Sequence, residues 1–262
     1  MKLSVSNIGW NSQQDREMYV WLQEQGIQGL EAAPTRLFPE GPYDRLEQAA
    51  VMAKELKTQY GLQIPSMQSI WYGMPQRISG TQEEWDKLYL YTEKAIDFAC
   101  ACSCRNLVFG CPKNRTVLQS ADAARNEQFL LEIAQAAHKK QAVIALEANP
   151  TIYHTNYINT TMEAIETVRR LDHPGLKLNL DFGTVLANEE CLNILKGNID
   201  IISHVHISEP GLKSLQRRQE HLVLKELLQQ GGYEYFVSLE MAQPEDFCAL
   251  TESILYLKEV FA

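Results

Sequence analysis

The chain has 262 residues, of which 45% are hydrophobic and 22% charged, and this is the composition of an ordinary globular protein with a sizeable core. A disordered, collagen-like or coiled-coil chain is thereby excluded. The formal net charge of −9 would repel a polyanion, so we do not expect nucleic acid as a partner.

Eight short apolar runs, rich in β-branched residues, alternate with longer amphipathic stretches. We predict strands at 3–10, 29–34, 64–70, 106–110, 142–150, 176–183, 201–210 and 235–241. Helical patterns lie between them, for example at 15–26, 43–61, 83–102, 123–141 and 161–171, and glycines such as Gly26 and Gly61 end several of them. Eight strand and helix repeats predict a (β/α)8 TIM barrel, an α/β fold that forms a single domain over residues 1–262.

A doubly wound sheet is the competing architecture. Its usual nucleotide-binding fingerprint, GxGxxG after the first strand, is absent, because only Gly9 follows that run. A phosphate-binding GxxxxGK[ST] motif is also missing, so nucleotide chemistry has no support in the sequence.

No apolar run approaches the roughly 18 residues of a membrane span, and the first ten residues lack a signal-peptide core. We therefore expect a cytoplasmic protein with no membrane partner. Cys100, Cys102 and Cys104 are spaced too closely in an i, i+2, i+4 pattern for a zinc knuckle. The simplest interpretation is that they are small thiols packing a helix against the sheet.

Four consecutive predicted strands end in a charged or imidazole side chain. These residues are Glu147, Asp181, His206 and Glu240. In a TIM barrel the strand ends share one mouth, where three carboxylates would repel one another without a positive centre. Oxygen donors with one imidazole suit a single divalent ion such as Mn²⁺, Mg²⁺, Co²⁺ or Zn²⁺.

Each of these residues also has a purely structural interpretation. In this interpretation Glu147 caps the following loop, Asp181 accepts backbone N–H groups in the turn before Gly183, and Glu240 pairs with a neighbouring base. His204 lies on the same side of its strand as His206, one layer deeper. We expect His204 to be a core histidine hydrogen-bonded to Asn179 or Ser238.

The segments LEANP, LNLDFG, HVHISEP and GGYEYFVSLE together resemble the xylose-isomerase-like barrel superfamily of sugar phosphate isomerases and ketose epimerases, over the whole chain. The resemblance implies that Glu147, Asp181, His206 and Glu240 hold the metal. Two positions depart from the ketose epimerases, since Thr184 and Leu212 stand where those enzymes have His and Arg. Endonuclease IV shares the fold but needs many histidines for its zinc cluster, and this chain has six.

Several further residues are candidates for contact with substrate at the mouth. Aromatic faces suit a sugar ring, and cations in FGCPKNR suit a phosphate or carboxylate. Each has a structural alternative, in which the tryptophans plug the barrel top, the cations are solvated and the histidine before the eighth helix is exposed. The predicted substrate-binding set is Trp10, Glu31, Gln68, Trp71, Lys113, Arg115, Asn149 and His221, with His154 and Asn156 as weaker candidates.

The predicted chemistry is proton transfer next to a carbonyl. A divalent ion chelated by the carbonyl and hydroxyl of a sugar or sugar phosphate stabilises an enediolate, and Glu147 and Glu240 would remove and return the proton from opposite faces. Isomerisation and epimerisation both follow from that intermediate. A dehydratase resembling inosose dehydratase and a sugar-binding barrel without turnover remain open, as does a homo-oligomer.

Overall fold

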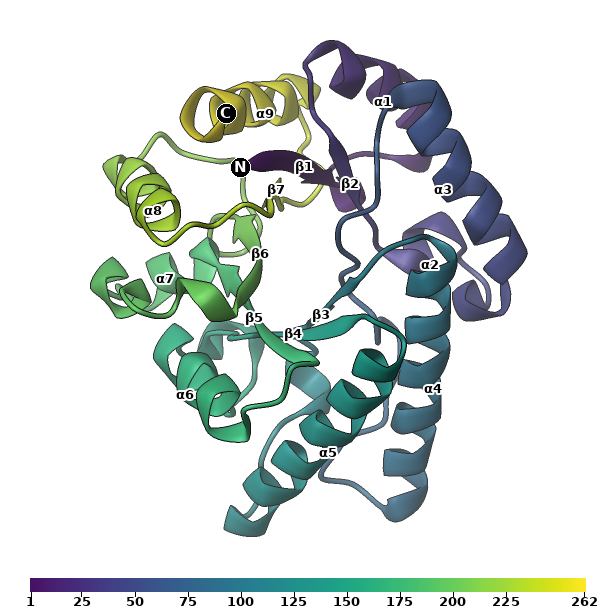
Figure 1. The fold of residues 1–262 in the computed structure, drawn as a ribbon, viewed down its shortest axis with the longest axis vertical. Coiled ribbons are helices and arrows are strands. Elements are labelled where there is room, and N and C mark those ends of the chain that lie inside the picture. The colour runs from purple at the N-terminus through teal and green to yellow at the C-terminus, as the bar shows by residue number, and fades with distance from the viewer.

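The computed structural model describes residues 1–262, the side chain of Ser120 excepted. A ring of parallel strands lies inside and helices lie outside it (Figure 1). The strands are β1 Lys2–Ser6, β2 Gly29–Glu31, β3 Asn106–Phe109, β4 Val143–Glu147, β5 Leu176–Asp181, β6 Ile202–Ile207 and β7 Phe236–Leu239. The helices are α1 Asp15–Glu24, α2 Pro34–Leu37, α3 Leu46–Tyr60, α4 Gln82–Ala101, α5 Ser120–Lys139, α6 Thr161–Leu171, α7 Phe182–Ala187, α8 Gln219–Gln230 and α9 Phe247–Phe261.

The strands follow the order β2-β1-β7-β6-β5-β4-β3, so β2 and β3 end the regular sheet. The third predicted strand lies between them but is not a regular strand. Gln63 bridges Gly29, and Met67 bridges both Ala32 and Leu107. Pro65, which has no N–H to donate, interrupts this segment and explains why its pairing is reduced to isolated bridges. The barrel prediction is thus confirmed, with seven regular strands and one irregular segment completing the ring.

Helix boundaries follow signals in the sequence. Thr81 and Thr160 cap α4 and α6, and each forms a capping box with the glutamate three residues on. Gly61, at φ 68°, ends α3 in the left-handed conformation that favours glycine. The short helices α2 and α7 were not among the predicted patterns.

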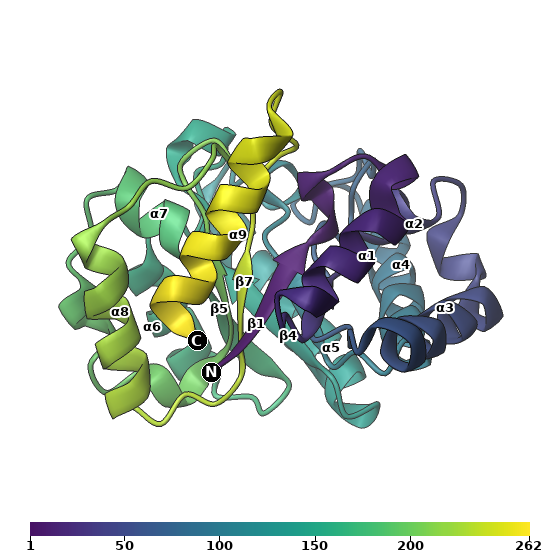
Figure 2. The same ribbon diagram turned by 90° about the horizontal axis from the view of Figure 1, so that it is seen from above.

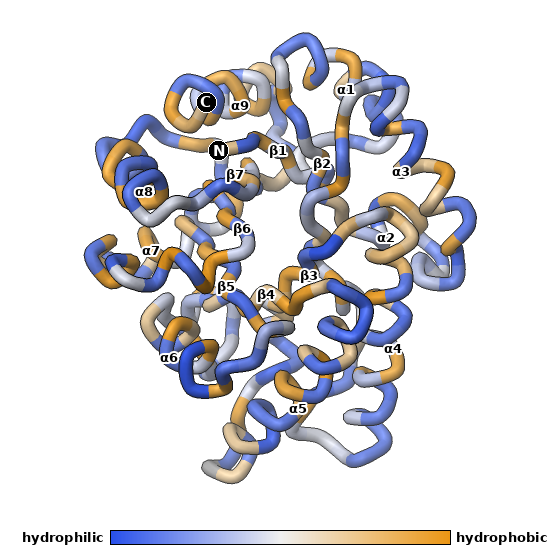
Figure 3. The backbone as a smooth tube through the Cα atoms, viewed as in Figure 1, coloured by the Kyte–Doolittle hydropathy of each residue, from blue (hydrophilic) through white to orange (hydrophobic). Residues whose placement is uncertain are grey.

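The core lies between the strands and the surrounding helices (Figure 2). Leu178 on β5 and Val205 on β6 are fully buried, and so are Leu224 on α8 and Ile254 on α9. Hydrophobic residues recur along the strands, while hydrophilic ones dominate the outer turns of the helices (Figure 3). Of the closely spaced cysteines, Cys102 and Cys104 are buried and Cys100 is exposed.

No helix among the described residues combines the length and the apolar character needed to cross a membrane.

Candidate metal centre

The carboxyl ends of β4, β6 and β7 bring three of the four predicted metal ligands together. His206 Nδ1 lies 3.1 Å from Glu147 Oε1 and 3.1 Å from Glu240 Oε2. One ligand atom of each residue lies within 4.8 Å of the others. Because the strands are parallel and in register, side chains that are distant in sequence meet at one rim.

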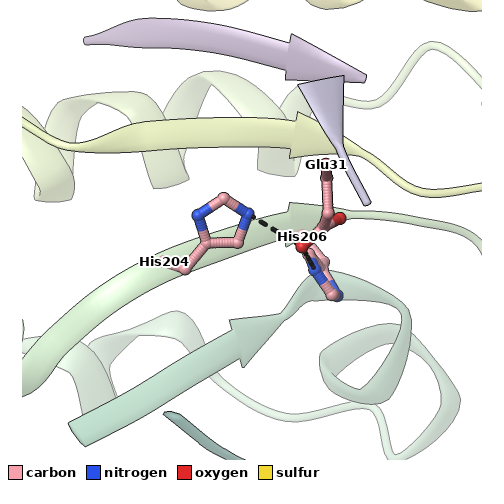
Figure 4. A group of neighbouring side chains, drawn as sticks. All are labelled: Glu31, His204 and His206. Atoms are coloured by element: carbon pink, nitrogen blue, oxygen red, sulfur yellow. Dashed lines mark hydrogen bonds and ion pairs between the residues drawn. The ribbon is translucent and has the colours of Figure 1, made fainter. Parts of the chain in front are cut away.

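Glu31, at the end of β2, reaches the other ring nitrogen of His206. Its Oε1 accepts from His206 Nε2 at 2.8 Å and lies 3.2 Å from His204 Nε2, so the carboxylate lies between two imidazoles (Figure 4). Glu31 was predicted to contact substrate, but its side chain is fully buried and is turned to these rings. A carboxylate on one ring nitrogen fixes the tautomer and leaves the other nitrogen to bind a metal.

His204 hydrogen-bonds Ser238 Oγ at 2.8 Å, which confirms the prediction of a core histidine held by Asn179 or Ser238. Burial lowers the pKa of His204, so its ring is neutral at pH 7. For His206, burial alone would lower the pKa, but the charges of Glu31 and Glu240 raise it well above its usual value. In the metal-free chain His206 is therefore an imidazolium among carboxylates.

Asp181 is the predicted ligand that does not join this group. It is the N-cap of α7: its two oxygens accept from the backbone N–H groups of Gly183 at 3.2 Å and Thr184 at 2.9 Å. Asp181 thus makes the backbone contacts that its structural interpretation predicted. Ser208 Oγ also donates to it, as does Thr184 Oγ1 at 2.7 Å. Where ketose epimerases have a histidine, this chain has a threonine that holds the aspartate.

Two asparagines hold the carboxylate of Glu147. Asn179 Nδ2 donates to Oε1 at 2.7 Å, and Asn149 Nδ2 donates to Oε2 at 3.0 Å. Arg115 in turn donates to Asn149 Oδ1 at 3.0 Å. Gly110 faces the same carboxylate, because a Cβ at this position would lie 2.6 Å from Glu147 Oε2. Asn149 therefore orients the predicted ligand and base, in place of the substrate contact predicted for it.

The carboxyl groups of this cluster lie close together and are buried, and the pKa values of two of them are raised. Burial raises the pKa of Glu240 to about 7, and the charges of Glu147 and Asp181 add to the rise although His206 opposes it. Burial and the charge of Glu147 likewise raise the pKa of Asp181. Carboxyls with raised pKa values in one cluster mark a site that lacks positive charge.

Three residues that were predicted to contact substrate at the rim are buried and hydrogen-bonded within the protein. Trp10 and Trp71 are each 2% exposed, and Gln68 is 3% exposed. Trp71 packs edge-on against Phe109, with ring centroids 4.9 Å apart. The two indole N–H groups and the Gln68 amide each donate to a protein oxygen, and the acceptors are Asp15 Oδ1, Thr92 Oγ1 and Ser6 Oγ. Both tryptophans are therefore buried and held by contacts within the protein, and neither presents a free ring face at the mouth.

The two predicted loop cations differ. Lys113 is exposed, as expected of a rim cation. Arg115 is fully buried, and its guanidinium donates to the backbone oxygens of Glu147 at 2.8 Å and Ile158 at 3.2 Å. The structure corrects the expectation that Arg115 stands above the mouth: the loop after β3 folds back and the arginine ties it to the chain after β4. Asn156 similarly bonds the backbone of Val117.

His221 is also placed differently from the prediction. It lies on α8, fully buried, with its ring 4.6 Å from that of Phe182 and 6.4 Å from that of Phe261. Its Nδ1 lies 3.0 Å from the hydroxyl of Tyr256 on α9. The side chain packs among aromatic rings between helices, so it is not a residue of the mouth.

Sequence reasoning missed Tyr153, in the loop after β4. Its hydroxyl accepts from the backbone N–H of Gly211 at 3.1 Å, which joins the loops after β4 and β6. Burial raises the pKa of Tyr153, and so do the charges of Asp181, Glu240 and Glu147, which places the phenol beside the acidic cluster. The only signal in the sequence is a tyrosine in TIYHTNY, shortly after a strand that ends in glutamate.

Comparison with known proteins agrees with the fold. The sequence model of the family described as xylose isomerase-like TIM barrel matches residues 20–259. No curated protein shows significant sequence similarity to the chain.

Solved structures share the fold at low sequence identity. The apo 3-keto-D-glucoside 4-epimerase of E. coli is 19% identical with a TM-score of 0.79, and 99% of each chain is covered. The D-psicose 3-epimerase of Clostridium cellulolyticum H10, solved with D-tagatose, is 16% identical with a TM-score of 0.78, covering 100% of this chain and 99% of that one. A protein named IolI, solved with a bound zinc atom, is 16% identical with a TM-score of 0.75, covering 99% and 96%.

Proposed function

The chain belongs to the xylose isomerase-like TIM barrel family, and on this premise we propose that it is a divalent-metal-dependent enzyme that isomerises or epimerises a sugar or sugar phosphate. The observation that carries the proposal is the meeting of Glu147, His206 and Glu240 at one strand-end rim, with Glu31 on the second nitrogen of His206. Two sugar epimerases and a zinc-bound protein among the structures of the same fold support it.

The residues fit a divalent ion. A carboxylate oxygen from each glutamate and a ring nitrogen from His206 form the donor set, and Asp181 at the edge of the cluster would be the fourth ligand. When bound, Mn²⁺, Mg²⁺, Co²⁺ or Zn²⁺ would supply positive charge that stabilises an enediolate of the substrate. It would also replace the proton that His206 carries in the metal-free chain.

Proton transfer falls to the two glutamates. Glu147 and Glu240 come from β4 and β7, on either side of β5 and β6, so they can approach opposite faces of a planar enediolate. In the metal-free chain the pKa of Glu240 is about 7, so this carboxyl can hold a proton near neutral pH before a metal binds. Asn149 and Asn179 fix the orientation of Glu147, and the phenol of Tyr153 can donate to a substrate oxygen.

Solvent exchange tests the proposal for every outcome of an enediolate. The metal-loaded protein is incubated in D₂O with ketoses, aldoses and their phosphates, and proton NMR follows loss of the C–H signal next to the carbonyl. We expect exchange with at least one sugar, and we expect Glu147→Gln to abolish it. The proposal is wrong if no sugar exchanges and the purified protein retains no divalent ion.

The same experiment separates the alternatives. A dehydratase would exchange the proton and also form a product with a conjugated keto-enol absorption. A binding protein without turnover would bind a sugar and exchange nothing.

A further inference from the structure

A cavity of about 530 Å³ opens at the end of the barrel opposite the metal centre. Its wall contains the first residues of several strands, among them Asn106 of β3, Val143 of β4 and Ile202 of β6. Since the strands are parallel, these residues lie at the amino end of the ring and away from Glu147 and Glu240. The volume falls in the range of pockets that bind small molecules.

The rim of this cavity carries positive charge. Arg105 is exposed and Lys177 is half-buried, and over the described part of the chain no carboxylate oxygen lies within 4.0 Å of either. Asp200 also lines the cavity, but Arg169 engages its carboxylate, with Nη1 donating at 2.9 Å. Two cations without ion-pair partners, on a chain of net charge −9, favour a negatively charged ligand.

The wall of the cavity is polar, since Gln63, Ser103 and Gln141 line it. Asn106 is 5% exposed, and its Nδ2 donates to Ser66 Oγ at 3.0 Å. Its Oδ1 is closed to solvent and has no hydrogen-bond partner among the described residues, so Asn106 belongs to the wall behind the cavity surface. His204 forms another part of the wall and lies 3.2 Å from Glu31, which in turn holds His206.

We propose that this cavity binds a small hydroxylated anion, a polyol phosphate or a sugar acid. Arg105 and Lys177 hold the phosphate or carboxylate at the rim, and the hydroxyls of the ligand face the polar side chains of Gln63, Ser103 and Gln141. Through His204 and Glu31 the ligand is linked by side-chain contacts to His206, which gives the protein a second small-molecule site in contact with its metal centre.

Calorimetric titration of the full-length protein tests the site, with glycerol 3-phosphate and glycerate as the two anionic probes and glycerol as the neutral one. We expect saturable binding of at least one anion and much weaker binding of glycerol. The double variant Arg105→Gln with Lys177→Gln should weaken anion binding by more than about tenfold, since each charge-assisted hydrogen bond contributes about one such factor. Lys113→Gln, which removes an exposed cation at the other end of the barrel, is the matched control and should bind as the parent does.

A second variant tests the interior. Asn106→Asp keeps the shape of the side chain and adds a negative charge, so it should abolish anion binding while the melting temperature shows that the fold persists. The site does not exist if neither anion binds, or if the double variant binds as tightly as the parent protein. Loss of binding in Lys113→Gln alone would place the anion at the metal-centre rim and would equally refute the cavity. Only binding is measured, so the result is independent of whether the protein turns over a sugar.

Discussion

In two regions of the barrel a histidine is completely buried, but its surroundings shift its pKa in opposite directions. At the end of β6, the carboxylates around His206 raise the pKa well above its usual value despite burial. Between α8 and α9, His221 faces aromatic rings, and burial lowers its pKa to about 4. Burial alone disfavours an imidazolium, and only a surplus of carboxylates reverses that preference. The comparison indicates that the side chains around the carboxyl end of β6 stabilise a positive charge.

The largest effect is expected from removing one carboxylate of the His206 region. Glu240→Gln should lower the exchange rate by about 10³-fold or more, since acid–base groups alone contribute about 10²–10⁴-fold, and should lower the metal content of the purified protein. Glu234→Gln makes the same chemical change at an exposed site and should alter neither. If Glu240→Gln exchanges and binds metal like the parent, the His206 region is not a metal centre.

Arg115 extends the comparison to a buried cation without a carboxylate partner, because its guanidinium donates to neutral backbone and amide oxygens. Burial lowers the pKa of Arg115 to about 10. Arg115→Gln should reduce the free energy of unfolding by about 3 kcal/mol, because it leaves buried backbone and amide oxygens without donors. Urea denaturation measures the change, and Lys113→Gln should stay within about 0.5 kcal/mol of the parent. Equal stability of the two variants would show that the arginine does not tie the loops together.

His221 predicts the pH dependence of stability. Its pKa is about 4 in the folded chain against 6.5 as the ordinary value, so below pH 6.5 the unfolded chain binds the proton first. The contribution of neutral His221 is present above pH 6.5 and is lost as the pH falls toward 4, by up to about 3 kcal/mol. His221→Phe should flatten the decline in urea midpoint over this range, whereas His154→Asn, at an exposed position, should leave it unchanged. If the urea midpoint of His221→Phe declines with falling pH as steeply as that of the parent, His221 does not cause the decline and the contrast with His206 is wrong.

The smallest expected effect is that of Glu31→Gln. Loss of the carboxylate that orients His206 should weaken metal affinity by about 10–100-fold, the usual cost of such a change. Competition with a fluorescent chelator measures the affinity, and ¹⁵N NMR of the ring in the metal-free protein should show a lower pKa for His206, because the charge of Glu31 raises it in the parent. The exposed Glu24→Gln is the control. An unchanged pKa and an unchanged affinity would mean that Glu31 serves packing only.

The sequence predicted what depends on periodicity. Alternating strands and helices gave the barrel, and charges closing apolar runs gave Glu147, His206 and Glu240, because parallel strands bring their ends to one rim. The third run failed as a regular strand because Pro65 removes a donor within a short segment. The local pattern therefore predicts whether a segment is a strand or a helix. It does not predict whether a strand pairs regularly along its length.

Side-chain direction at the mouth could not be predicted. Arg115 follows β3 by several residues, and whether it faces the ring or the loops depends on how the loop folds back. His221 begins a helix like an exposed residue, but α9 covers its face. Tyr153 went unnoticed because only the contact between the loops after β4 and β6 brings its hydroxyl near the acids. These placements arise from contacts between segments far apart in sequence.

The irregular segment between β2 and β3 is the part of the barrel wall that lacks a regular strand. Backbone bonds cross it on both sides, from Leu30 N to Gln63 O at 2.9 Å and from Val108 N to Met67 O at 2.8 Å, but they form no continuous ladder. Local opening should begin there, so the amides of Leu30 and Val108 should exchange with solvent hydrogen sooner than those within β5 and β6. We therefore expect one side of the barrel wall to open locally before β4 and β6, which carry Glu147 and His206 of the candidate metal centre.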